Sequence, residues 1–134
     1  MAAPPPDRGP WGLLRCVLAL LIALHGWARL SAGGVAPFGQ WLEGLGFPLG
    51  PAIAWTITLF EIVGTPLLAW GRWLVLPLTL GYSMIYATGI VLVHAPAGWF
   101  VVGLGRNGAE YSVLLITALL CVGWRHTQLA RKAA

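Results

Sequence analysis

Residues 54–70, AWTITLFEIVGTPLLAW, form an apolar run that carries one carboxylate, Glu61, near its centre. Pro51 opens this run, which reaches about 20 residues and is long enough for one helix to cross a bilayer. An acid at that depth costs a few kcal/mol, so its side chain should face other helices rather than lipid. Small or polar residues and one leucine share its helical face: Thr58, Gly64, Thr65 and Leu68. The run therefore predicts a membrane helix whose polar face meets a bundle.

The composition of the whole chain supports a membrane protein. Hydrophobic residues make up 58% of the 134 positions, and charged residues only 9%. A soluble domain carries charge at roughly a quarter of its positions, so this chain cannot cover a water-facing surface. The net charge is +4, but the basic residues form no dense cluster that could follow a phosphate backbone. We therefore expect the lipid bilayer, and not nucleic acid, as a partner.

Four apolar runs divide the chain. They are separated by a Gly/Pro-rich segment, by a tight turn at Gly71-Arg72 and by the loop APAGWFVVGLGRN. In the Gly/Pro-rich segment, helical spacing of Phe38, Trp41, Leu42 and Leu45 predicts a short interfacial helix. The expected fold is all-α and transmembrane, a four-helix bundle with a short interfacial helix in the first outward loop. The four spans are expected at about residues 11–30, 51–70, 73–94 and 108–124.

One domain is expected, a four-helix transmembrane unit over residues 11–125. A disordered N-terminal tail, residues 1–10, would precede it, and a basic cytoplasmic tail, residues 126–134, would follow. Pro66 and Pro77 fall inside the second and third runs, where they predict kinks. The first run is also open to interpretation as a secretory signal. Arg15 inside the run, and the length of its apolar core, favour a membrane span.

The basic residues predict the orientation of the bundle. With four crossings, both termini and the Gly71-Arg72 turn share one side of the membrane. The positive-inside rule then puts both termini in the cytoplasm of a multi-pass protein of the cell inner (plasma) membrane. The side with the termini holds Arg8, Arg15, Arg72, Arg125, Arg131 and Lys132, and the other side holds Arg29 and Arg106.

Each run carries at least one ionisable side chain toward the predicted outer side. His25 and Arg29 are four residues apart on the first run, so they share a helical face. Tyr86 and His94 continue a stripe on the third run, and Glu110 opens the fourth run with Leu114, Thr117 and Cys121 at helical spacing behind it. We expect a polar pocket around Glu61 that opens outward. The candidate site residues are His25, Arg29, Glu61, Tyr86, His94 and Glu110.

A histidine beside a carboxylate has a pKa range suited to moving protons near neutral pH. Glu61 and His25 are therefore candidate catalytic residues, and the other four are candidate ligand-binding residues. The alternative is an internal network of salt bridges and hydrogen bonds that only holds the helices together. A metal or haem site between His25 and His94 stays open in principle, although no ligand spacing points to one. The chain carries no hydrolase, nucleotide-loop, zinc-protease or haem-attachment motif.

Four segments carry further patterns, at residues 25–30, 60–71, 94–100 and 108–115. Together they resemble motifs of the DoxX family of small bacterial membrane proteins. HGWARL, residues 25–30, is similar to the HG-x-x-K-L end of that family's first helix, with Arg29 in place of lysine. FEIVGTPLLAWG, residues 60–71, resembles the E-x-x-G-x-x-L pattern of its second helix. HAPAGWF, residues 94–100, resembles its H-x-P-x-G-F-F loop, and GAEYSVLL, residues 108–115, resembles its G-x-E-Y opening of the fourth helix. The family's GPG-type segment after the fourth helix is replaced by VGWRHTQ.

The resemblance implies a four-helix membrane bundle with a polar set of His25, Arg29, Glu61, His94 and Glu110. Some relatives are subunits of thiosulfate:quinone oxidoreductase, and others are linked to oxidative-stress complexes at the membrane. The expected function is that of a subunit of a quinone-linked membrane oxidoreductase system, whose pocket binds a quinone head group or relays protons. No covalently bound cofactor is expected, and a partner oxidoreductase subunit would supply electrons. The alternatives are a non-catalytic membrane anchor or organiser of partner proteins, and a small transporter that would need to form a homo-oligomer.

Overall fold

The computed structural model describes residues 5–133, and four helices in this part of the chain are long and apolar enough to cross a membrane. They are α1 (Pro10–Ser31), α3 (Gly50–Trp70), a continuous third span (Val75–Ala97) and α6 (Glu110–Ala133). The third span consists of α4 (Val75–Gly89), the π-helical η1 (Ile90–His94) and α5 (Ala95–Ala97). The short helix α2 (Val35–Gly44) lies between the first two spans. The predicted all-α transmembrane fold is confirmed.

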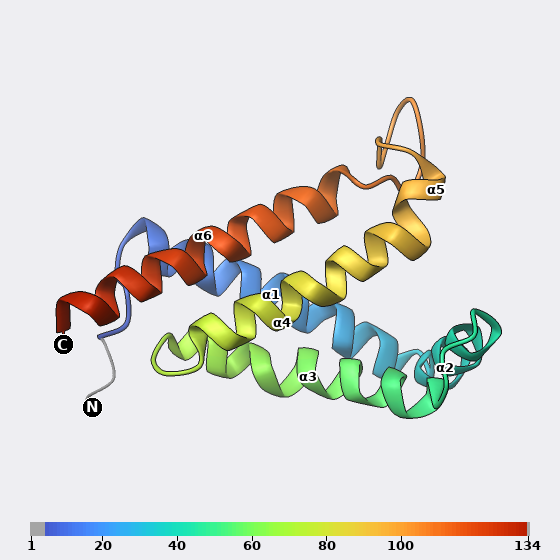
Figure 1. Cartoon of the computed structure of the whole chain (residues 1–134), viewed down its shortest axis with the longest axis horizontal. Helices are drawn as coiled ribbons and strands as arrows, with labels where there is room; N and C mark the ends of the chain where they lie inside the picture. Colours follow the sequence, from blue (N-terminus) through green and yellow to red (C-terminus); the bar gives the residue numbers. More distant parts are fainter. Residues whose placement is uncertain (1–4, 134) are drawn as a thin grey trace.

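The four spans run side by side as a bundle (Figure 1). α1 packs along α3 and α4 packs along α6, while shorter contacts between α3 and α4 and between α1 and α6 join the two pairs. The pairs lie close together where α1 begins and α6 ends, and they spread apart toward α2 and α5. We call the first of these the inner end of the bundle and the second the outer end.

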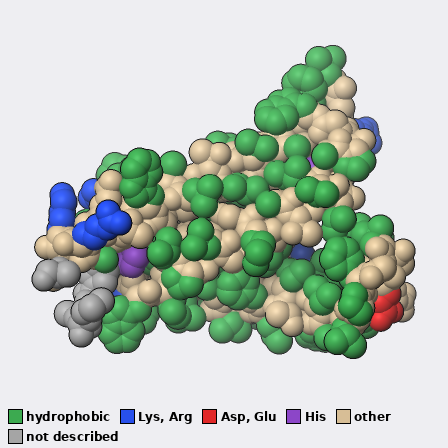
Figure 2. Space-filling view, viewed as in Figure 1, with side chains coloured by type: hydrophobic (Ala, Val, Ile, Leu, Met, Phe, Trp, Pro, Cys, Tyr) green, Lys and Arg blue, Asp and Glu red, His purple; other side chains and the backbone are tan. Residues whose placement is uncertain are grey.

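The core of the bundle is formed by apolar side chains from all four spans. Its fully buried members include Ile22, Leu68, Tyr82 and Leu119. A second, smaller cluster of Val35, Leu42 and Ala54 joins α2 to α3. Hydrophobic side chains are spread along the length of the bundle surface seen in Figure 2, and most Lys and Arg side chains gather at the inner end. The apolar sides of the four spans form the surface that contacts the bilayer.

Proline and glycine positions account for several helix ends. Pro10 and Pro51 stand in the first turns of α1 and α3, where the missing backbone N–H is not needed. α3 ends at Gly71, whose φ of 75° is left-handed and favours glycine. α4 begins only at Val75, so Pro77 stands in its first turn, where a proline fits without the kink that the sequence predicts.

The two segments that the sequence predicts as tails contact or continue the bundle over their described residues. α6 continues to Ala133, so the expected C-terminal tail is helical over its described part. Residues 1–4 of the expected N-terminal tail lie outside the described residues. Within that tail, Oδ2 of Asp7 accepts a hydrogen bond from Nε of Arg125 at 2.8 Å. The segment that precedes α1 is thereby held against α6.

Candidate functional site

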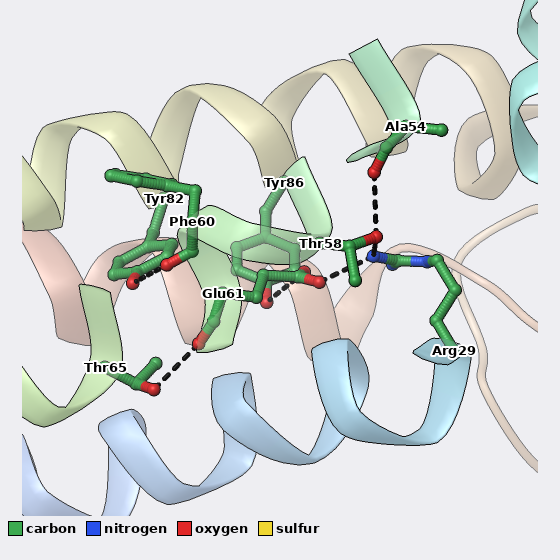
Figure 3. Close-up of polar contacts among 8 residues, drawn as sticks. All are labelled: Arg29, Ala54, Thr58, Phe60, Glu61, Thr65, Tyr82 and Tyr86. Carbon is green, nitrogen blue, oxygen red and sulfur yellow. Dashed lines mark hydrogen bonds and ion pairs between the residues drawn. The ribbon is translucent and has the colours of Figure 1, made fainter. Parts of the chain in front are cut away.

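Glu61 lies on the face of α3 that meets the other spans, and it is only 2% exposed. Its Oε2 accepts a hydrogen bond from Nη1 of Arg29 on α1 at 2.7 Å, so the two residues form a salt bridge (Figure 3). A carboxylate at this depth is costly unless a cation and hydrogen-bond donors pair with it. Arg29, one of the two basic residues that share a face of the first span, therefore stabilises the charge on Glu61.

The guanidinium of Arg29 has two further neighbours. Its Nη1 also donates to Oγ1 of Thr58 at 3.1 Å, and Thr58 donates in turn to the backbone oxygen of Ala54 at 2.7 Å (Figure 3). Its Cζ lies 4.8 Å from the ring centroid of Phe38 on α2, which is a cation–π distance. α2 therefore packs against the guanidinium of Arg29, and α3 supplies both side chains that accept hydrogen bonds from that guanidinium.

Gly26 brings α1 close to α3 beside the salt bridge. A Cβ placed on Gly26 would lie 2.9 Å from Cβ of Glu61 and 2.9 Å from Cγ1 of Ile62. Small residues at such points let membrane helices approach closely. The glycine of HGWARL therefore has a packing role, because it lets Arg29, on the next turn, reach Glu61.

Two tyrosines of α4 have different partners near Glu61. Tyr86 donates from Oη to Oε1 of Glu61 in a long hydrogen bond of 3.5 Å (Figure 3). The ring of His25 stands edge-on to the ring of Tyr86, with centroids 6.3 Å apart. Tyr82 donates instead to the backbone oxygen of Phe60 at 2.8 Å. Tyr86 and His25 thus belong to the surroundings of Glu61, whereas Tyr82 connects α4 to α3.

A cavity of about 470 Å³ opens beside the salt bridge at the outer end, and we call it the outer cavity. It lies between α1, α2, α3 and the third span. Five of the six predicted site residues line it: His25, Arg29, Glu61, Tyr86 and His94. Most of the remaining wall is apolar: Phe38, Trp41, Leu42, Phe47, Ile53, Ile57, Met84, Ile85, Leu92 and Val93. A largely apolar cavity with a few convergent polar groups is the usual form of a small-molecule site.

The π-helical η1 shapes one wall of the outer cavity. Its last three residues, Leu92, Val93 and His94, all line the space. A π-helical turn holds more residues than an α-helical one, and such segments are frequent at functional sites. Nδ1 of His94 also lies 2.8 Å from the backbone oxygen of Asn107. This contact ties the end of the third span to the loop that precedes α6.

Glu110 does not join the other predicted site residues in the outer cavity. It begins α6, and its Oε1 accepts a hydrogen bond from the backbone N–H of Val101 at 2.9 Å, so it organises the preceding loop. The stripe behind it was expected to face the bundle, but Leu114 is 66% exposed and Thr117 is also exposed. The buried face of α6 contains Ser112, Leu115, Leu119, Val122 and Gly123. The expected face is wrong because this run is apolar on every side, so residue spacing alone does not select the buried side.

Two residues of the site were not predicted as such. Phe38 is expected from the sequence only as part of an interfacial helix, and Thr58 only as part of a polar stripe, yet both contact Arg29. Helical spacing signals that each faces inward. That both contact Arg29 depends on how α2 folds back over α1 and α3. No local sequence pattern predicts that arrangement.

Within residues 5–133, no group of three or more His, Cys, Asp and Glu side chains is gathered closely enough to hold a metal ion. Cys16 and Cys121 are both free thiols. The side chains gathered around Glu61 can form hydrogen bonds, and the carboxyl, phenol and imidazole groups of Glu61, Tyr86 and His25 can exchange protons beside the guanidinium of Arg29.

A family comparison covers the part of the chain that builds this site. The model of the DoxX family matches residues 11–95, from the start of the first span to the end of the third. The chain belongs to the DoxX family. The matched region of this DoxX protein includes His25, Arg29, Glu61 and His94 and ends before Glu110. Comparisons with curated proteins and with solved structures found no match.

Proposed function

We propose that this DoxX protein is a subunit of a quinone-linked membrane oxidoreductase system, and that the outer cavity holds the quinone head group. The observation that carries the proposal is that the salt bridge between Arg29 and the buried Glu61 opens onto a largely apolar cavity of about 470 Å³. A quinone head group is a flat ring with carbonyl oxygens, so it needs an apolar space with a few hydrogen-bond donors. The outer cavity offers both.

Arg29 and Glu61 have separate roles in this proposal. A guanidinium carries five N–H donors, so Arg29 has donors for a head-group oxygen beyond those that Glu61 and Thr58 accept. When bound, a quinone takes up two electrons and two protons to become a quinol. The electrons come from a partner subunit with a redox centre. Glu61 and His25 hold and exchange the protons at the head-group oxygens.

The side of the outer cavity that faces lipid supports entry of a quinone from the bilayer. Met84, which is 70% exposed, and Thr88, which is also exposed, line the cavity on the lipid-facing side of α4. A lipid-soluble molecule therefore reaches the cavity between α3 and the third span without leaving the membrane. By the positive-inside rule, the Lys and Arg side chains at the inner end support a cytoplasmic location of both termini. The head group then lies in the outer half of the plasma membrane.

Glu61→Gln tests the proposal because it keeps the size of the side chain and removes its charge. Binding of a short-tailed benzoquinone to the protein in lipid nanodiscs is followed by quenching of tryptophan fluorescence. We expect the wild type to bind and Glu61→Gln to lose affinity about tenfold, which corresponds to about 1.4 kcal/mol. The matched control is Glu43→Gln, the same change at an exposed position of α2, and it should bind as the wild type does.

Full quinone affinity in Glu61→Gln would refute the proposed role of this residue. Lower thermal stability of Glu61→Gln with unchanged quinone binding would instead favour the non-catalytic anchor. In that case the salt bridge between α1 and α3 only holds the two helices together.

A further inference from the structure

A second cavity of about 190 Å³ lies beside the outer cavity. It is bounded by α1, the third span, the first turn of α6 and the loop before α6. His25, Tyr86 and His94 line both cavities. These three side chains therefore stand between the outer cavity and the second one.

The wall of the second cavity is mostly apolar in area but carries several polar side chains. Besides the shared residues, it contains Ser112, which is 4% exposed, together with Tyr111, Asn107, Val101 and Gly108. A water molecule occupies about 30 Å³ in the liquid and needs two to four polar partners when it is enclosed. A space of about 190 Å³ therefore holds several water molecules, and hydroxyl, imidazole and backbone groups along its wall supply their partners.

The second cavity also reaches the outer surface of the protein. Asn107 is exposed and His94 is half-buried. The contact between Nδ1 of His94 and the backbone oxygen of Asn107, at 2.8 Å, holds the loop beside the cavity. The cavity thus extends from the surface of the outer loop to the ring of Tyr86, which in turn contacts Glu61.

We infer that the second cavity is an aqueous vestibule through which Glu61 exchanges protons with water on the outer side of the membrane. The use of those protons rests on the proposed function, whereas the presence of water does not. Tyr86 receives a proton at Oη from a hydronium ion in the vestibule and passes its own hydrogen to Oε1 of Glu61, 3.5 Å away. The hydronium becomes water, Glu61 becomes neutral and Tyr86 ends unchanged. The reverse step carries a proton outward.

Cysteine accessibility tests the vestibule. In the full chain with Cys16 and Cys121 replaced by serine, Ser112→Cys puts a thiol on the vestibule wall with little change in size. A membrane-impermeant, sulfonate-bearing methanethiosulfonate reagent is added to the outer face of right-side-out vesicles. The matched control is Leu115→Cys, which lies about one turn further along the buried face of α6 in the apolar core and is 3% exposed. We expect labelling of the cysteine at position 112 and none at position 115.

Absence of labelling at position 112, or labelling only from the opposite face of the membrane, overturns the vestibule. Quinone binding is measured on the same Ser112→Cys sample to separate the two proposals. If quinone binds and position 112 stays unlabelled, the vestibule is wrong and the proposed function stands. If position 112 is labelled and quinone does not bind, the vestibule is supported and the proposed function fails.

A second measurement tests the proton step at Tyr86. Stopped-flow infrared spectroscopy follows the carboxylate band of Glu61 after a sudden drop in the outer pH, and Glu61→Gln identifies that band. Tyr86→Phe removes the hydroxyl that contacts Oε1 of Glu61, so protonation of Glu61 should slow. Tyr82→Phe makes the same change on the same helix, away from the carboxylate oxygens, and should leave the rate unchanged. Equal rates in wild type and Tyr86→Phe exclude Tyr86 from the path.

Discussion

Two arginines of α1 meet α3 near opposite ends of the bundle, and their partners differ. Arg15, near the inner end, is 6% exposed and donates from Nε and Nη2 to the backbone oxygen of Ala69 at 3.4 and 3.3 Å. Arg29, toward the outer end, donates instead to the carboxylate of Glu61. The two arginines are about four helical turns apart and so share one face of α1. Each arginine of α1 therefore donates hydrogen bonds to α3, one to a backbone carbonyl and the other to a carboxylate.

The surroundings of the two arginines show what the difference means. At the inner end, the space beside Arg15, Asp7 and Arg125 measures only about 10 Å³, too little for more than one water molecule. At the outer end, the Arg29–Glu61 pair opens onto a cavity of about 470 Å³. A backbone carbonyl cannot change its charge, whereas a carboxylate gains and loses protons. The inner contact therefore closes the bundle, and the outer contact borders the cavity of the proposed site.

Replacing each arginine by methionine should give the largest difference in stability between these two contacts. Arg29→Met leaves the carboxylate of Glu61 buried without a cation, so it should lower the free energy of unfolding by about 3–5 kcal/mol. Arg15→Met leaves the backbone carbonyls of Ala69 and Asp7, and no charged group, without this donor, which should cost about 1–3 kcal/mol. Thermal and denaturant unfolding in detergent measures both. An equal or larger loss in Arg15→Met contradicts the contrast between the two ends.

A substitution at Gly26 should disturb the outer contact through packing alone. The methyl group in Gly26→Ala meets Cβ of Glu61 and Cγ1 of Ile62 at 2.9 Å, so the helices must separate at a cost of about 1–3 kcal/mol. Gly89→Ala, in α4, meets no atom within 4 Å and should be neutral or stabilising by about 0.5–1 kcal/mol. Unfolding of the two variants side by side measures the difference. Equal stabilities would show that α1 and α3 have room to spare beside Glu61.

The two tyrosines of α4 should show the smallest difference in stability. Tyr82→Phe removes a 2.8 Å hydrogen bond to the partly buried backbone oxygen of Phe60, which should lower the free energy of unfolding by about 1 kcal/mol. Tyr86→Phe removes only the 3.5 Å contact with Glu61 and should cost less than about 0.5 kcal/mol. Melting temperatures in the same detergent compare them. A greater loss in Tyr86→Phe would make its hydroxyl a structural group and weaken its place in proton exchange.

Features that depend on one helix at a time could be predicted from the sequence. Run length and apolar composition predict the four spans, and the stripe of Thr58, Glu61 and Gly64 predicts which face of α3 is buried. The cost of an unpaired charge in lipid predicts that Glu61 has a basic partner, but the sequence leaves Arg29 and His25 both open, and the structure gives Arg29.

Features that depend on several elements together could not be predicted. The contact of Phe38 with Arg29 requires α2 to fold back, and the π-helical turn before His94 leaves no mark in residue spacing. The fourth run is apolar on every side, so its residue spacing does not select a buried face. The buried face of α6 is set by packing against α4. The second cavity forms where three spans and a loop meet, so Ser112 has no signal of its own in the sequence.

The most direct test of the account is a structure of the protein in nanodiscs with a brominated quinone, whose bromine marks the ligand in anomalous or cryo-electron density. The account predicts density in the outer cavity, with a head-group oxygen within hydrogen-bond distance of Arg29 or Glu61. Density found only on the lipid-facing surface or at the inner end, with the outer cavity filled by side chains or acyl chains, would contradict it.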